Sequence, residues 1–149
     1  WLLETEFEWR GICAEPNPDL FARLKANRRC MTSSDCIGAR TGEVVEFILA
    51  DAFGGIAHYA QLDHHAERRE AFRRDGRTMR VSTISLADFL AKYNAPRDID
   101  YLSIDTEGSE YDILSHFPFD RWRINLITVE HNHAPQRELI RKLLEPLGY

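Results

Sequence analysis

The sequence predicts an α/β fold built on a doubly wound, mostly parallel sheet with helices on both faces. Strand-like and helix-like segments alternate along the chain, and the last three strand-like segments, 81–85, 99–105 and 124–130, are nearly continuous apolar runs. Such runs are typical of strands buried on both faces, as in a parallel sheet covered by helices. Both observations indicate the same layered architecture.

The first third of the chain predicts two strands, each following a helical segment. Residues 1–7 look like the end of a helix, and a short strand at 11–14 ends at Glu15. Pro18 can begin a helix, because proline suits the first helical position and apolar residues follow at helical spacing. A second strand is expected at about 30–33.

The middle of the chain predicts one exception to the parallel order. Residues 41–50 have a Thr-Gly turn followed by β-branched and aromatic residues, which indicates an antiparallel strand. Residues 53–59 predict a turn and a short extended piece. Residues 63–77 are densely charged with a single phenylalanine, Phe72, which is typical of a solvated helix or a mobile loop.

The last part of the chain repeats strand and helix. After the strand at 81–85, Ser85 and Asp88 have the spacing of a capping box, which predicts a helix start. A strand at 99–105 leads to a helix from about Ser109, and a strand at 124–130 leads to a helix within 134–149. In the last helix, apolar residues are expected on one face, namely Leu139, Ile140, Leu143 and Leu144.

Length and charge exclude several classes of protein. The 149 residues are enough for one domain with a real core, and 44% apolar with 29% charged residues excludes wholesale disorder. The formal net charge of −5 gives no electrostatic footprint for duplex nucleic acid. No apolar run approaches the ~20 residues that span a bilayer, so neither nucleic acid nor membrane is an expected partner.

The three cysteines predict a reducing compartment. Cys13, Cys30 and Cys36 form an odd set without the paired spacing of a metal site, and two lie in strand-like segments. Buried free thiols are the expected state, and the start of the chain shows no signal-peptide pattern. We therefore expect a cytoplasmic protein; the sequence does not fix its oligomeric state.

Acidic residues follow the predicted strands and mark a candidate site. Glu15, Asp105 and Glu130 each come directly after a strand, and Asp35 follows the strand that ends near Ser33. In doubly wound folds, ligands bind beyond the carboxyl ends of the strands. Because neighbouring carboxylates repel one another, stability alone is a poor explanation for this repeated placement.

Each acidic residue also has a structural interpretation. Glu110 and Asp112 fall in the first turn of a helix, where the dipole favours anions, so helix capping is the better explanation for both. Capping accounts for one of Asp105 and Glu107, but not for both. Glu15 suits bidentate hydrogen bonds to the hydroxyls of a ribose, and its alternative is a solvated turn residue.

Two histidines follow Glu130 in the sequence. Together with Asp105 and Glu130, His131 and His133 offer oxygen and nitrogen ligands to a divalent cation. The spacing is not diagnostic, and imidazoles at strand ends more often act as hydrogen-bonding or general-base groups. The sequence therefore predicts no metal site, with a divalent cation as the alternative.

Three segments in order carry a family resemblance: WRGICAEPNPDLFARLKANRRC at 9–30, YLSIDTEGSEYDIL at 101–114 and NLITVEHN at 125–132. They resemble the FkbM-type S-adenosylmethionine-dependent methyltransferases, and the likeness extends over essentially the whole chain. The resemblance implies a Rossmann-like domain that methylates hydroxyls of sugars and natural products. The pair IDTEGSE and VEHN is its most specific part.

The resemblance also implies roles for individual residues. Glu15 corresponds to the acid that holds the cofactor ribose, and Asp35 to a polar residue near the adenine. Asp105 corresponds to the residue beside the methionine part of the cofactor and the methyl-transfer centre, while Glu130 and His131 line the substrate side. The implied cofactor-binding set is Glu15, Pro16, Asn17, Asp35, Asp105 and Glu107, and the implied catalytic set is Asp105, Glu130 and His131.

The same resemblance predicts that residues 1–149 are a fragment of a single Rossmann-like methyltransferase domain. The family's first strand and glycine-rich loop would precede Trp1, and further strands would follow Tyr149. A fragment of this kind would lack one wall of the cofactor pocket.

The predicted function is therefore S-adenosylmethionine-dependent O-methylation of a sugar or another natural-product small molecule. Asp105, Glu130 and His131 are the candidate general bases, and the unperturbed pKa of a histidine, ~6.5, suits that task. The main alternative is a non-catalytic module that keeps the scaffold and binds a nucleotide or a partner. A nicotinamide-dependent oxidoreductase is a third option; its glycine fingerprint would lie in the segment expected before Trp1.

Overall fold

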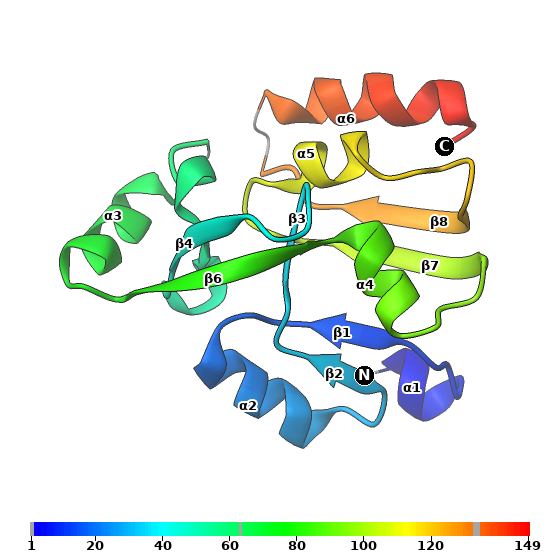
Figure 1. The fold of residues 1–149 in the computed structure, drawn as a ribbon, viewed down its shortest axis with the longest axis horizontal. Coiled ribbons are helices and arrows are strands. Elements are labelled where there is room, and N and C mark those ends of the chain that lie inside the picture. Colours follow the sequence, from blue (N-terminus) through cyan, green and yellow to red (C-terminus); the bar gives the residue numbers. More distant parts are fainter. Residues whose placement is uncertain (1, 63, 133–134) are drawn as a thin grey trace. The chain divides into compact units, whose positions relative to one another are not determined.

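The computed structural model describes residues 2–62, 64–132 and 135–149, and the chain divides into two compact units (Figure 1). The first unit is Trp1–Cys36 and the second is Ile37–Tyr149. Among the described helices, none combines the length and the apolar character that a membrane span needs.

The first unit is a small parallel βαβ arrangement that matches the sequence prediction. Helix α2 begins at Pro18 because the Asn17 side chain caps it, accepting a hydrogen bond from the Asp19 amide at 3.0 Å. Strands β1 and β2 pair in parallel, with Cys13 opposite Thr32. The elements are α1 (Leu2–Glu6), β1 (Ile12–Ala14), α2 (Pro18–Asn27) and β2 (Met31–Ser33).

From β3 onward the chain forms two further sheets and the helices that cover them. The strands are β3 (Cys36–Gly38), β4 (Val44–Ile48), β5 (Gly55–Ile56), β6 (Thr78–Ser85), β7 (Asp98–Ile104) and β8 (Arg123–Val129). The α-helices are α3 (Ala66–Arg74), α4 (Leu86–Lys92), α5 (Glu110–Ser115) and α6 (Gln136–Leu144). Short 3₁₀ turns are η1 (Asp51–Phe53), η2 (Ala57–Tyr59) and η3 (Glu145–Leu147).

The sheets are small and mixed, so the fold class is confirmed only as α/β. The strand orders are β1-β2, β3-β6-β4-β5 and β7-β8, and a single doubly wound sheet is not seen. Strand β4 is antiparallel to β5 and β6, as predicted for residues 41–50, while β7 and β8 are parallel. The prediction of β6 as a strand of the parallel set is wrong. Five of its residues, Thr78–Ser82, pair antiparallel with β4, from Val44 opposite Ser82 to Ile48 opposite Thr78.

The main core of the second unit lies between the β7-β8 pair and its helices. Ile113 and Leu114 of α5 are 2% and 0% exposed and belong to one cluster with Ile104 of β7 and Ile124 of β8. In α6, only part of the predicted face is fully inside: Ile140 and Leu144 are buried at i, i+4, Leu143 packs partly, and Leu139 is 45% exposed. Ser85 caps α4 through the Asp88 amide, as its spacing predicts.

Helix α3 is present where a charged helix or loop was predicted, but it is not wholly solvated. Phe72 packs against a second cluster that Ile48, Ala50 and Ala60 form. Arg69 is 0% exposed, which contradicts the expectation that this segment is solvent-facing. The three cysteines are free thiols, as predicted; Cys36 is buried, whereas Cys13 and Cys30 are half-buried with their sulfur atoms 3.6 Å apart.

Candidate functional site

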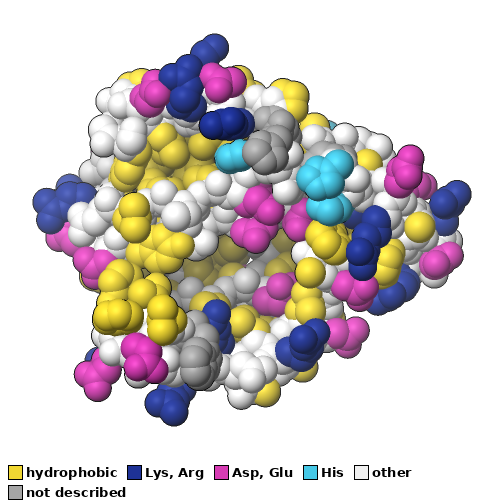
Figure 2. Space-filling model, turned by 180° about the vertical axis from the view of Figure 1, so that it is seen from behind, with side chains coloured by type: hydrophobic (Ala, Val, Ile, Leu, Met, Phe, Trp, Pro, Cys, Tyr) yellow, Lys and Arg dark blue, Asp and Glu magenta, His cyan; other side chains and the backbone are white. Residues whose placement is uncertain are grey.

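The candidate site lies where β7 and β8 end. These parallel strands pair with Ile104 opposite Val129, and the Glu130 amide donates to the Ile104 carbonyl at 2.9 Å. The next residues, Asp105 and Glu130, therefore leave the sheet side by side. One carboxylate oxygen from each lies within 4.8 Å of the other and of a Glu110 oxygen. In the face shown in Figure 2, acidic side chains (magenta) adjoin histidine side chains (cyan).

The carboxyl groups of Asp105 and Glu130 lie close together, and this raises the pKa of Glu130. Oε2 of Glu130 is buried and, among the described residues, has no hydrogen-bond partner while the group is a carboxylate. Once protonated, Glu130 donates a hydrogen bond to Asp105. This bond, followed by burial and by the nearby negative charges, raises the pKa of Glu130 from 4.5 to about 8. At neutral pH the Glu130 carboxyl group is therefore mostly protonated.

The raised pKa of Glu130 predicts how the stability of the fold changes with pH. Because the pKa of Glu130 is raised, its protonated form is favoured in the folded state, and stability falls as pH rises from about 4.5 to about 8. We expect Glu130→Gln, which does not titrate, to gain roughly 1–2 kcal/mol of unfolding free energy relative to wild type between pH 5 and pH 9. This gain is well below the free energy that corresponds to the full pKa shift, because Glu130 is partly exposed and solvent screens its charge.

Urea unfolding at pH 5, 7 and 9 measures this gain. The exposed Glu67 of α3 provides a matched control, since Glu67→Gln should follow the pH dependence of the wild type. The same pH dependence in both variants would show that no proton is held at the strand ends.

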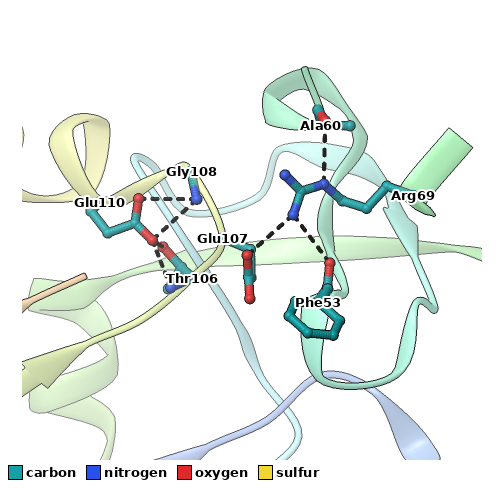
Figure 3. A network of polar contacts seen from close by, with 7 residues as sticks. All are labelled: Phe53, Ala60, Arg69, Thr106, Glu107, Gly108 and Glu110. Carbon is teal, nitrogen blue, oxygen red and sulfur yellow. Dashed lines mark hydrogen bonds and ion pairs between the residues drawn. The ribbon is translucent and has the colours of Figure 1, made fainter. Parts of the chain in front are cut away.

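The loop after β7 closes on itself through Glu110. This side chain is 3% exposed and accepts hydrogen bonds from the Thr106 amide at 2.8 Å, the Thr106 hydroxyl at 3.1 Å and the Gly108 amide at 3.0 Å (Figure 3). The structural interpretation of Glu110 is therefore confirmed, although its partners are loop amides before the helix. Asp112 has a different partner, accepting from the Tyr59 hydroxyl at 2.6 Å.

Glu107 lies inside the protein in an ion pair. It is 8% exposed, and its Oε2 lies 3.1 Å from Nη1 of Arg69. The predicted contact of Glu107 with a cofactor remains a prediction, and the structure gives this carboxylate an internal cation. Sequence reasoning missed Arg69 and Tyr59. Helical phase offers a signal for Arg69, which precedes the apolar Phe72 by three residues and so shares its face.

A small open hollow adjoins Glu110 and Glu130. His131 lines it and is half-buried, which places this predicted residue beside Glu130. The Gln136 side chain on its rim donates to the Gly108 carbonyl at 3.0 Å, linking α6 to the loop. The lining residues are Leu62, Gly108, Glu110, Glu130, His131, Asn132 and Gln136.

The potential metal ligands that lie together in the structure differ from the ligand set that the sequence suggested. The potential ligands that lie together are Asp105, Glu110 and Glu130, without His131. Glu110 already accepts loop hydrogen bonds, and Glu130 holds a proton against Asp105. His133 lies outside the described residues.

The first unit holds its own predicted residues at the carboxyl ends of β1 and β2. The Glu15 amide donates to the Ser33 carbonyl at 2.9 Å, and Oε1 of Glu15 accepts from the Asn17 amide at 2.8 Å. Asp35 accepts from the Ser33 hydroxyl at 2.6 Å. Asn17 is 4% exposed and caps α2, while Pro16 is half-buried between it and Glu15. The structure therefore gives Asn17 a structural role and fixes the direction of the Glu15 carboxylate.

The comparisons with known proteins identify a family. The chain matches none of the curated proteins and none of the solved structures with which it was compared. A family model described as the methyltransferase FkbM domain, however, matches residues 3–149. This match covers nearly the whole chain, including both strand-end segments, and agrees with the resemblance of the three sequence segments. The chain belongs to the FkbM methyltransferase domain family.

Proposed function

We propose that this domain is an S-adenosylmethionine-dependent methyltransferase that methylates a hydroxyl oxygen of a small molecule, a sugar or another natural product. The observation that carries the proposal is the pair of carboxyl groups of Asp105 and Glu130, which lie close together at the ends of β7 and β8. Membership of the family supports methyl transfer in general. The carboxyl pair supports an acceptor that must lose a proton, as a hydroxyl does.

Each of the two units holds residues that fit part of the chemistry of this cofactor. A carboxylate held in one direction, as Oε1 of Glu15 is by the Asn17 amide, suits bidentate acceptance from two ribose hydroxyls. Asp35 at the end of the neighbouring strand suits a polar contact near the adenine. The negative charge at Asp105 and Glu110 suits a positively charged group. When bound, S-adenosylmethionine supplies an electrophilic methyl group on a sulfonium.

The chain's own residues align the acceptor and take up its proton. Methyl transfer is an in-line displacement, so alignment of the attacking oxygen supplies several kcal/mol of the rate enhancement. The exposed Asp105 takes the hydroxyl proton as the acceptor oxygen attacks the methyl carbon. Glu130 holds its own proton against Asp105 and fixes the direction of that carboxylate. His131, which lines the adjoining hollow, orients the acceptor or relays its proton.

Calorimetric titration of S-adenosylhomocysteine into the complete protein tests the proposal. We expect micromolar binding in the wild type and at least about a tenfold loss in Glu15→Ala, because a bidentate charged hydrogen bond is removed. Asp19→Ala is a matched control, since Asp19 is an exposed acid in the first turn of α2. Binding of NAD instead would favour an oxidoreductase, and binding of neither would indicate a non-catalytic module.

A further inference from the structure

We infer that Arg69 is a positioning residue for the strand-end site, the centre of a brace that holds the loop 105–110 in its working conformation. The brace is defined as residues 53–60 together with Arg69. The consequence for kcat rests on the proposed function, whereas the effect on the loop itself does not.

Arg69 joins three segments that are distant in the sequence (Figure 3). Its Nη1 donates to Oε2 of Glu107 at 3.1 Å and to the Phe53 carbonyl at 3.3 Å, and its Nε donates to the Ala60 carbonyl at 3.2 Å. Phe53 is the last residue of the 3₁₀ turn η1, and Ala60 is the residue that follows η2. A guanidinium has the fixed fork of donors that such a junction needs, and a buried arginine requires partners of this kind.

Glu107 needs to be held, because its backbone adopts an unfavourable conformation. Its φ is +58°, in the left-handed region that residues with a Cβ rarely adopt, and Gly108 follows with a φ of +115°. Strain of this kind persists only where the surroundings fix it, and it concentrates at functional sites. The ion pair with Arg69 supplies the restraint two residues after Asp105.

The rest of the brace packs against the same loop at close range. A Cβ on Gly55 would lie 3.1 Å from Cβ of Glu107, and a Cβ on Gly108 would lie 3.0 Å from Cβ of Tyr59. Both glycines therefore permit an approach that larger residues would oppose. The Tyr59 hydroxyl adds a hydrogen bond of 2.6 Å to Asp112 in α5. Packing and hydrogen bonds thus act together on both sides of the loop.

The brace and the carboxyl pair are coupled through the loop's own hydrogen bonds. The amides of Thr106 and Gly108 bind Glu110, whose carboxylate lies within 4.8 Å of those of Asp105 and Glu130. Release of Glu107 would let the intervening peptide rotate and would move Asp105. A displacement of about 1 Å at the reacting groups can lower a rate about 10²-fold.

Hydrogen exchange and kinetics on the complete protein test the inference with Arg69→Met and Arg69→Lys. In Arg69→Met we expect the amides of Thr106 and Gly108 to exchange about tenfold faster or more, while the amides of α6 keep wild-type rates. We expect kcat to fall about tenfold or more with KM for the cofactor nearly unchanged. Arg69→Lys keeps the charge but not the fork, so it should be intermediate on both readouts.

Arg73→Met is the matched control, because Arg73 lies on the same helix and pairs with Glu46 at the surface. It should behave as the wild type. If Arg69→Met does not fold, Tyr59→Phe decides: it removes one hydrogen bond of the brace, and exchange at Thr106 and Gly108 should still accelerate. Wild-type exchange at these amides in the folded variant would overturn the inference. Absence of methyl transfer in the wild type would instead refute the proposed function, and the exchange rates would still decide whether the brace positions the loop.

Discussion

Asp105→Asn is expected to lower kcat by about 10²–10⁴-fold and so to abolish methyl transfer in most assays. Asparagine has the same shape as aspartate but does not take up a proton from the acceptor. Its Oδ1 still accepts the hydrogen bond from protonated Glu130, so the second carboxyl keeps a partner. Asp105 is exposed, and its loss should leave the melting temperature within a few degrees of wild type.

The measurement is single-turnover methyl transfer beside calorimetric binding of S-adenosylhomocysteine. Binding should change little, which separates a defect in chemistry from a defect in the cofactor site. Asp100→Asn is the control, because Asp100 is an exposed acid on the same strand and accepts a hydrogen bond from Asn125 of β8. Full activity in Asp105→Asn would exclude this carboxylate as the base and leave Glu130 and His131 as candidates.

Glu110→Ala is expected to have the largest effect on stability, about 3–4 kcal/mol at pH 7. The variant leaves the amides of Thr106 and Gly108 without their acceptor in a closed loop, and hydrogen bonds to a charged group contribute about 1.5–3 kcal/mol each. These effects are not additive, since both amides bind one side chain. Glu110→Gln keeps one acceptor and should lose about half as much.

Urea unfolding measures both variants, with Glu145→Ala as the control. Glu145 pairs with Arg141 at the surface of α6, and exposed pairs contribute about 0–1 kcal/mol. A loss below 1 kcal/mol in Glu110→Ala would mean that the loop keeps its conformation without the carboxylate. Glu110 would then become available for a role in ligand binding.

Local sequence signals predicted the elements well, because their causes are local. The proline at the start of α2 and the cap at Ser85 each act within a few residues of the helix that they begin. The strands that end at Glu15, Asp105 and Glu130 were likewise visible as apolar runs. For the same reason, the placement of the acidic residues at strand ends could be inferred from the sequence.

The pairing of strands depended on long-range contacts and was only partly predictable. The apolar residues of β6 predicted a parallel strand. The strand instead pairs antiparallel with β4, although several other elements separate the two strands in the sequence. The chain between them contains η1, β5, η2 and α3, and β5 pairs with the opposite side of β4. Hydrophobic pattern does not specify which neighbour a strand selects.

The site was predicted at the level of its acids but not of their partners. Asp105 and Glu130 were both recognised, whereas the raised pKa of Glu130 follows from spatial proximity and burial. Arg69 was missed because the charge composition of residues 63–77 describes the segment as a whole. It does not show which face of helix α3 is buried. Its role became visible only once Glu107, in another part of the chain, was found opposite it.

The Arg69–Glu107 ion pair has a consequence for how this domain can diverge. Loss of either partner alone leaves a buried, unpaired charge, so a lineage that changes one position passes through a destabilised intermediate unless the other changes too. The two positions should therefore covary among relatives, although they are far apart in the chain. For the same reason, transfer of residues 105–110 into another protein would require transfer of helix α3 as well.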